Sequence, residues 1–100
     1  MEAMKKCWSV LTDDMYTCYI TGRNVVNIHH IFNGSRKAAS EKYGFLVPLH
    51  PILHTQGPDS VHMAPNRGLD LRLKQECQKY YEEHYGSREE FIAIFGRSYL

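Results

Sequence analysis

The stretch Val25-Val-Asn-Ile-His-His-Ile-Phe32 decides how this sequence is interpreted. Its β-branched and aromatic residues favour a strand. Side chains alternate between the two faces of a strand, so the adjacent His29 and His30 point to opposite sides and cannot do the same job. Asn33-Gly-Ser35 then ends the strand, which places both histidines beside a loop where side chains can reach a cleft.

A second strand is expected just upstream, at Met15-Tyr-Thr-Cys-Tyr-Ile20. The connector Thr21-Gly-Arg-Asn24 is short and contains glycine and asparagine. Two strands joined in this way predict a β-hairpin. Arg36–Tyr43 is predicted to form a short helix that Gly44 ends.

The second half of the chain predicts a loop followed by two helices. Pro48 restricts the apolar run Phe45–Leu49 to an edge strand or an extended loop, and residues 50–66 are a proline-rich loop with one helical turn at Pro51–His54. Apolar residues at helical spacing predict a long amphipathic helix at about 67–85. Ser87-Arg-Glu-Glu90 is a capping box that opens a last short helix.

These elements predict one α+β domain over residues 1–100. It divides into an N-terminal extension (1–14), a hairpin and metal-site region (15–66) and C-terminal helices (67–100). No apolar run approaches the ~18 residues of a membrane helix, and the N-terminus lacks the pattern of a secretory signal. The three cysteines are odd in number and widely spaced, which favours a reducing compartment. A cytoplasmic protein is therefore expected.

Charge gives a weaker indication. The formal net charge is +1, from 12 basic and 11 acidic residues, so the chain is no polycation. Between Thr21 and Pro48, however, four basic residues face a single acid, Glu41. This local excess indicates a basic patch that could meet phosphates.

Histidine is the compositional anomaly. Five of the six histidines lie between His29 and His62. They are either a chance enrichment on the surface or a group that converges on one site, as metal ligands or acid–base groups. An imidazole that titrates near ~6.5 can take a proton from water at neutral pH while a nearby ion stabilises charge on a phosphate.

An ordered set of short motifs resembles a known nuclease family. The motifs are Cys18-Tyr-Ile-Thr-Gly-Arg23, His29-His-Ile-Phe32, Arg36-Lys37, Ser40-Glu-Lys-Tyr-Gly44, Leu46-Val-Pro-Leu49 with His54, Val61-His62, Leu69-Asp-Leu71 and Phe95-Gly-Arg-Ser-Tyr-Leu100. Together they resemble the HNH, or ββα-metal, nuclease finger. They are further similar to small phage and prophage proteins related to the RecA-dependent recombination-enhancement nuclease. The resemblance covers about residues 9–100.

The resemblance implies a role for each matched residue. His30 falls on the general base that activates water. His29, His54 and His62 fall on ligands of one divalent ion, with Mg²⁺ or Mn²⁺ expected in catalysis and Zn²⁺ or Ni²⁺ also suited to imidazole. The residues expected to contact DNA phosphates are Arg23, Arg36 and Lys37.

Two departures from the family pattern matter. The family's paired zinc-binding cysteines are here reduced to Cys18-x-x-Thr21 and His50-x-x-Leu53, which leaves too few ligands for a structural zinc. No structural zinc is expected, so packing of Tyr16, Ile20 and Val26 against the long helix should hold the hairpin. The middle asparagine of the family has no counterpart, because Phe45 occupies its place.

The main expectation is a small metal-dependent DNA endonuclease of phage or prophage origin that hydrolyses phosphodiesters in a bacterial cytoplasm. Its expected partners are DNA and a recombination protein, and a homodimer would place two fingers on two strands. The first alternative is a degenerate, non-catalytic finger that binds DNA or a protein partner in recombination or phage–host conflict. The second is a histidine-rich structural protein that takes up metal only from purification resin.

Overall fold

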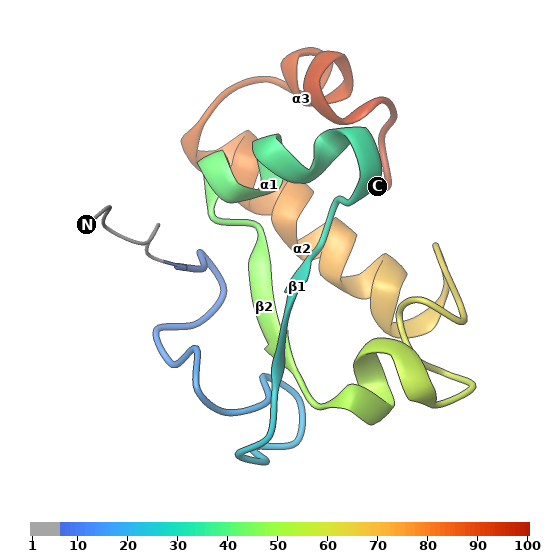
Figure 1. Cartoon of the computed structure of the whole chain (residues 1–100). Helices are drawn as coiled ribbons and strands as arrows, with labels where there is room; N and C mark the ends of the chain where they lie inside the picture. The colour runs from blue at the N-terminus through green and yellow to red at the C-terminus, as the bar shows by residue number, and fades with distance from the viewer. Residues whose placement is uncertain (1–6) are drawn as a thin grey trace.

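A computed structural model describes residues 7–100 of the chain (Figure 1). Its elements in order are strand β1 (Asn27–His30), 3-10 turn η1 (Gly34–Arg36), helix α1 (Lys37–Tyr43), strand β2 (Leu46–Leu49), π-helical turn η2 (Ile52–Gln56), helix α2 (Gly68–His84) and helix α3 (Arg88–Phe95). The α+β class is as predicted. In Figure 1 the two strands run through the centre, α2 crosses beside them, and α1 and α3 lie together at one end.

The sheet consists of β1 and β2, paired antiparallel. His29 lies opposite Val47, and His30 opposite Leu46. All four residues of β2 are buried. Pro48 is tolerated because both strands of a two-stranded sheet are edges, as the sequence predicted, and its carbonyl still accepts a hydrogen bond from Tyr19 N at 2.9 Å.

The predicted hairpin between residues 15–20 and 25–32 is wrong. Residues 15–20 form bends and turns, and the partner of β1 comes from 46–49, beyond α1. Cys18 N donates to Arg23 O at 2.8 Å and Gly22 N donates to Cys18 O at 2.8 Å, which closes a compact turn at Gly22 (φ 75°). Strand propensity reflects how well a side chain fits a half-buried pleated surface, and the fully apolar 46–49 run fits that surface better.

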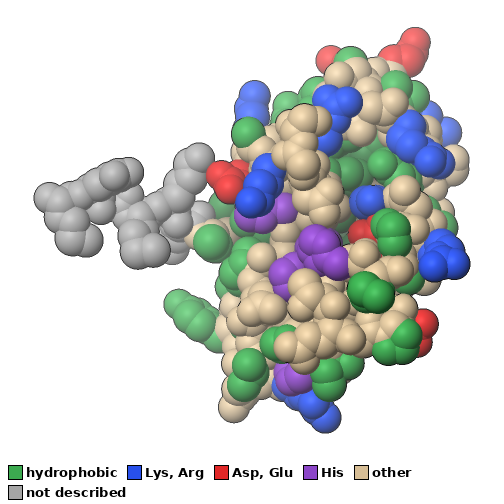
Figure 2. Space-filling model, turned by 45° about the vertical axis from the view of Figure 1, so that its right-hand side comes forward, with side chains coloured by type: hydrophobic (Ala, Val, Ile, Leu, Met, Phe, Trp, Pro, Cys, Tyr) green, Lys and Arg blue, Asp and Glu red, His purple; other side chains and the backbone are tan. Residues whose placement is uncertain are grey.

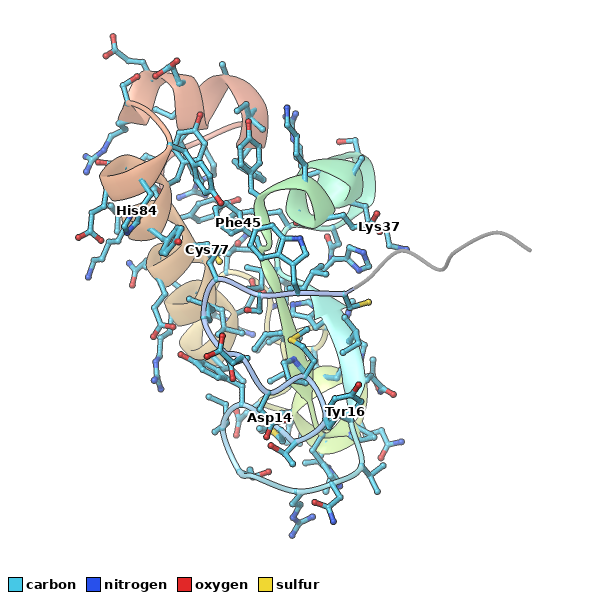
Figure 3. All side chains as sticks on the ribbon, turned by 90° about the vertical axis from the view of Figure 1, so that its left-hand side faces the viewer. Asp14, Tyr16, Lys37, Phe45, Cys77 and His84 are labelled. Carbon is cyan, nitrogen blue, oxygen red and sulfur yellow. The ribbon has the colours of Figure 1, made fainter. Side chains whose placement is uncertain are left out.

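The expected packing of the hairpin on the long helix is wrong for the same reason. Tyr16, which is labelled in Figure 3, is 84% exposed. Ile20 is 40% exposed, so neither residue anchors this segment. Val26 does pack against the core, and the buried Cys18 belongs to it.

The helix ends follow the local sequence. α1 ends at Gly44, which has a left-handed φ of 74° and donates its N–H to Ser40 O. The buried Ser40 hydroxyl donates to Phe32 O at 2.6 Å and accepts from Phe32 N at 3.0 Å, so α1 is fixed to the end of β1. The predicted capping box is present at Ser87 and Glu90, and the long helix lies within about one residue of its predicted ends.

The core lies between the sheet and the three helices. Its aromatic centre is Phe32, which contacts Phe45, Phe91 and Phe95 with ring centroids 5.9, 5.7 and 4.4 Å apart. Each buried phenylalanine contributes about 1.5–3 kcal/mol of transfer free energy. Within residues 7–100 no helix combines the length and apolarity needed to cross a bilayer.

Candidate metal centre

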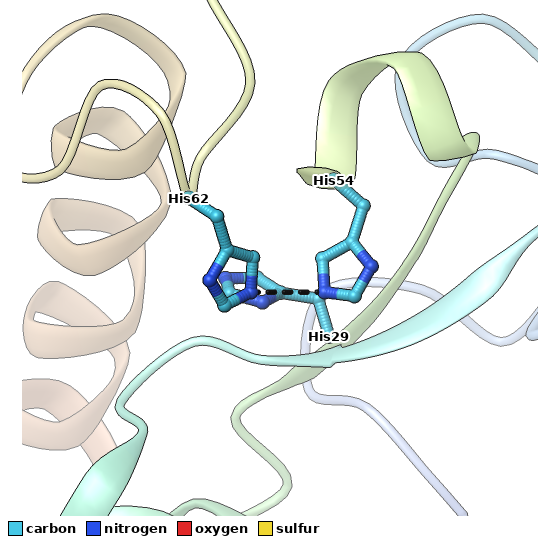
Figure 4. A group of neighbouring side chains, drawn as sticks. All are labelled: His29, His54 and His62. Carbon is cyan, nitrogen blue, oxygen red and sulfur yellow. Dashed lines mark hydrogen bonds between the residues drawn. The ribbon is translucent and has the colours of Figure 1, made fainter. Parts of the chain in front are cut away.

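Three histidines from three separate segments meet at one place (Figure 4). His29 comes from β1, His54 from η2 and His62 from the loop between η2 and α2. One ring nitrogen of each lies within 4.8 Å of the others, and Nε2 of His54 is 3.1 Å from Nε2 of His62. The structure thus brings together all three residues that the resemblance implied as ligands.

Backbone hydrogen bonds hold His62 against His54. Val61 N donates to Leu53 O at 2.8 Å, and His62 N donates to His54 O at 3.2 Å. Val61 is 3% exposed, so the residue next to His62 is anchored in the core. The turn that carries His54 is π-helical, closed by Gly57 N donating to Ile52 O at 2.9 Å, and single π-turns recur at functional sites.

A buried ion pair fixes the far end of the same loop to α2. Asp70 is 4% exposed, and its Oδ2 accepts from Asn66 N at 2.6 Å and from Lys74 Nζ at 2.9 Å. Lys74 Nζ also donates to Asn66 Oδ1 at 2.8 Å. The loop that carries His62 is therefore attached at both ends, which limits how far its imidazole can move.

Burial keeps the deepest of the three rings neutral. His29 is 2% exposed, and its Nε2 has no hydrogen-bond partner. Desolvation, and then the neighbouring His54 and His62, lower the pKa of His29 from 6.5 to about 3. Burial and the proximity of His62 also lower the pKa of His54. Both rings are accordingly neutral at physiological pH, the form in which histidine binds a metal.

The residues fit a divalent ion. Two nitrogen ligands of one tetrahedral ion lie about 3.4 Å apart when each bond is ~2.0–2.1 Å, so the His54–His62 pair needs almost no movement and His29 a small one. The buried, unpartnered Nε2 of His29 is also what an ion would satisfy. Three imidazoles suit Zn²⁺ or Ni²⁺ better than Mg²⁺ or Mn²⁺, which prefer oxygen ligands.

His30 shares a cavity with the three histidines. The cavity, of about 600 Å³, is lined by His29, His30, His54 and His62 together with Ile28, Asn33, Gly34 and Lys37. Nε2 of His30 is 2.8 Å from Oε2 of Glu41 on α1. Glu41 therefore holds one of the two ring nitrogens of His30 and fixes the orientation of the ring.

The expected DNA-contacting residues lie in different surroundings. Lys37 is exposed and lines the cavity. Arg36 donates from Nη1 to Ile94 O at 2.8 Å and so ties η1 to α3. Arg23 lines a separate cavity of about 300 Å³ with His50. Figure 2 shows histidines gathered on one face with lysine and arginine side chains around them.

Sequence reasoning missed two partners of the site histidines. In the sequence, Glu41 stands out only as the lone acid of a basic stretch, and Asn27 only as a residue of the predicted strand. Asn27 Nδ2 lies 3.1 Å from Nδ1 of His54. Asn27 could have been noticed because it is polar and lies two positions before His29. No sequence pattern pairs Asn27 with His54 or Glu41 with His30, because each contact joins two separate elements.

Comparison of the chain with protein-family models, with curated proteins and with solved structures finds no match. The geometry of the site and the resemblance in its motifs therefore carry the functional argument.

Proposed function

We propose that the protein is a metal-dependent nuclease that hydrolyses phosphodiester bonds in DNA. The observation that carries this proposal is one cavity containing both a three-histidine cation site and a fourth histidine paired with a carboxylate. Metal-assisted hydrolysis needs these two parts side by side, an ion for the phosphate and a base for the water.

His30 is the general base in this proposal. Glu41 accepts the Nε2–H of His30, so Nδ1 carries the lone pair that takes a proton from the attacking water. Water oxygen bonds to phosphorus as the bond from phosphorus to the leaving oxygen breaks, and that oxygen takes a proton from solvent. Glu41 also stabilises the imidazolium that forms on His30, as an opposite charge at 2.8 Å does.

The remaining cavity residues bind the substrate. His29, His54 and His62 would hold the cation, which would supply Lewis-acid stabilisation of the charge that develops on the phosphate. Lys37 at the rim attracts the phosphate backbone, a contact that adds affinity without reading sequence.

The order of elements supports the finger interpretation. β1 carries His29 and His30, β2 pairs with it, and the helical turn after β2 carries His54. The resemblance to ββα-metal nucleases implies paired strands, a histidine pair at a strand end and His54 at a following helix; here the second strand follows the histidine pair, and α1 lies between the two strands. The proposed phage or prophage origin and the role in recombination follow from the same resemblance.

A plasmid-nicking assay tests the proposal. Purified protein is incubated with supercoiled plasmid and Mn²⁺, Mg²⁺ or Zn²⁺, with chelator as the blank. His30→Ala should lower the nicking rate by about 10²-fold or more while Zn²⁺ affinity is unchanged, because the base is lost but the ligands remain. His84→Ala is the matched control, because His84 is an exposed imidazole outside the cavity.

Two outcomes would overturn the proposal. Nicking that His30→Ala leaves intact would overturn the assignment of His30 as the base, on which the proposed mechanism rests. Plasmid binding with no nicking under any of the three ions would instead identify a non-catalytic DNA-binding finger.

A further inference from the structure

Asn27 is the polar side chain that reaches the cation site from the side opposite His62. It is the first residue of β1 and is exposed, and its Nδ2 is 3.1 Å from Nδ1 of His54. The other ring nitrogen of His54, Nε2, lies 3.1 Å from Nε2 of His62. His54 therefore sits between two hydrogen-bond partners, one on each ring nitrogen.

A neutral imidazole carries a single proton, so these two hydrogen bonds are linked. When the amide of Asn27 donates to Nδ1, the proton of His54 must be on Nε2, where it can be donated to His62. In that form Nε2 of His54 has no lone pair for a cation. Binding an ion through Nε2 requires the proton to be on Nδ1, and Nδ1–H then needs an acceptor.

The carboxamide of Asn27 can serve both forms. Rotation of the Asn27 amide by 180° places Oδ1 where Nδ2 was. Asn27 can therefore either donate from Nδ2 to His54 Nδ1 or accept at Oδ1 from His54 Nδ1–H. We propose that Asn27 is a positioning residue of the cation site, which fixes the Nδ1–H tautomer of His54 and so presents Nε2 to the ion. The inference rests on the cation site of the proposed function, and it concerns metal binding before any chemistry.

The proposal has a specific consequence for substitutions at this position. Aspartate can only accept a hydrogen bond, so it favours the metal-binding tautomer, whereas alanine supports neither form. Outer partners of metal-bound histidines typically change metal affinity by about 10–100-fold. Because Asn27 is exposed and water can replace it in part, we expect Asn27→Ala to weaken Zn²⁺ binding by about tenfold. Asn27→Asp should bind Zn²⁺ more tightly than the parent.

Zn²⁺ affinity, measured by competition with a chelator at fixed pH, tests the first consequence. Asn24→Ala and Asn24→Asp are the matched controls, because Asn24 is also an exposed asparagine and its aspartate variant adds the same charge nearby. Long-range ¹H–¹⁵N correlation spectra of the imidazoles report the tautomer directly. The zinc-loaded parent and the empty Asn27→Asp variant should both show the Nδ1–H form of His54. Melting temperatures of the empty proteins check that the variants are folded.

The results separate this inference from the proposed function. The inference is overturned if the parent binds Zn²⁺ and both Asn27 variants bind it within twofold of the parent, or if Asn24→Asp tightens binding as much as Asn27→Asp. A parent that binds no divalent ion overturns the inference and the nuclease proposal together. If Zn²⁺ binds most tightly to Asn27→Asp, less tightly to the parent and most weakly to Asn27→Ala, the role of Asn27 is supported. If the same protein nicks no plasmid, only the nuclease proposal is overturned.

Discussion

Acid should destabilise this protein through its buried imidazoles, of which His29 is the most deeply buried. The pKa of His29 is about 3 in the folded chain and near 6.5 when the chain is unfolded. Between these two pH values, His29 is protonated in the unfolded chain and neutral in the folded chain. The free energy of unfolding therefore falls as pH falls below about 6.5, and the stability contributed by neutral His29 is fully present only above that pH.

The size of the effect follows from the same two values. Each pH unit between them is worth about 1.4 kcal/mol, so lowering the pH from 7 to 4.5 should cost about 2.5 kcal/mol at this residue alone. Other groups titrate in this range, so the measurement must be a difference between two proteins. His29→Phe is the suitable comparison, because it keeps an aromatic ring in the buried position and cannot be protonated.

The assay is urea denaturation followed by circular dichroism, in chelator, at pH 7, 6, 5.5, 5 and 4.5. His29→Phe should be at least as stable as the parent at pH 7, because it removes a buried nitrogen without a hydrogen-bond partner. The stability of the parent should then decline relative to the variant as the pH is lowered. His84→Gln, at an exposed position, should follow the parent. If the parent and His29→Phe lose stability in parallel, the assignment of the acid sensitivity to His29 is refuted.

Two further predictions concern the loop that carries His62. Zn²⁺ at a hundredfold excess over its Kd for the parent should stabilise the parent by about 2.7 kcal/mol. In differential scanning fluorimetry this should raise Tm by about 10 °C or more, whereas Mg²⁺ should not raise it. An equal Zn²⁺-induced shift in His62→Ala at the same concentration would contradict the three-histidine site. Asp70→Asn should lower the free energy of unfolding by about 2–3 kcal/mol and weaken Zn²⁺ binding, because it leaves the 13%-exposed Lys74 without its carboxylate. Restored stability in the double variant Asp70→Asn/Lys74→Met, measured by urea denaturation, would support this explanation, and unchanged stability of Asp70→Asn would exclude it.

The helices were predictable because their determinants are local. Gly44 ends α1 in the left-handed conformation that glycine adopts most easily, and Ser87 and Glu90 cap α3 within four residues of each other. The periodic apolar positions of α2 likewise need no knowledge of the rest of the chain. The ends of these helices are therefore set by neighbouring residues, although their stability comes from packing against the core.

The strand pairing was not predictable in this way. Residues 15–20 and 46–49 both have strand-forming composition, and the nearer segment was expected to pair with β1. The more distant one does so, because its apolar side chains fill the space between β1 and the helices while Tyr16 remains exposed. Competition between two candidate strands is decided by burial, which depends on elements far away in the sequence.

For the candidate site, the sequence by itself determined the ligand chemistry: a chain with five histidines between residues 29 and 62 has imidazoles to offer an ion. Only the tertiary structure decided that His29, His54 and His62 share one point, that Glu41 holds His30, and that Asn27 reaches His54. Residue type fixes which atoms can bind, but the distance between those atoms depends on how β1, η2 and the loop before α2 pack together.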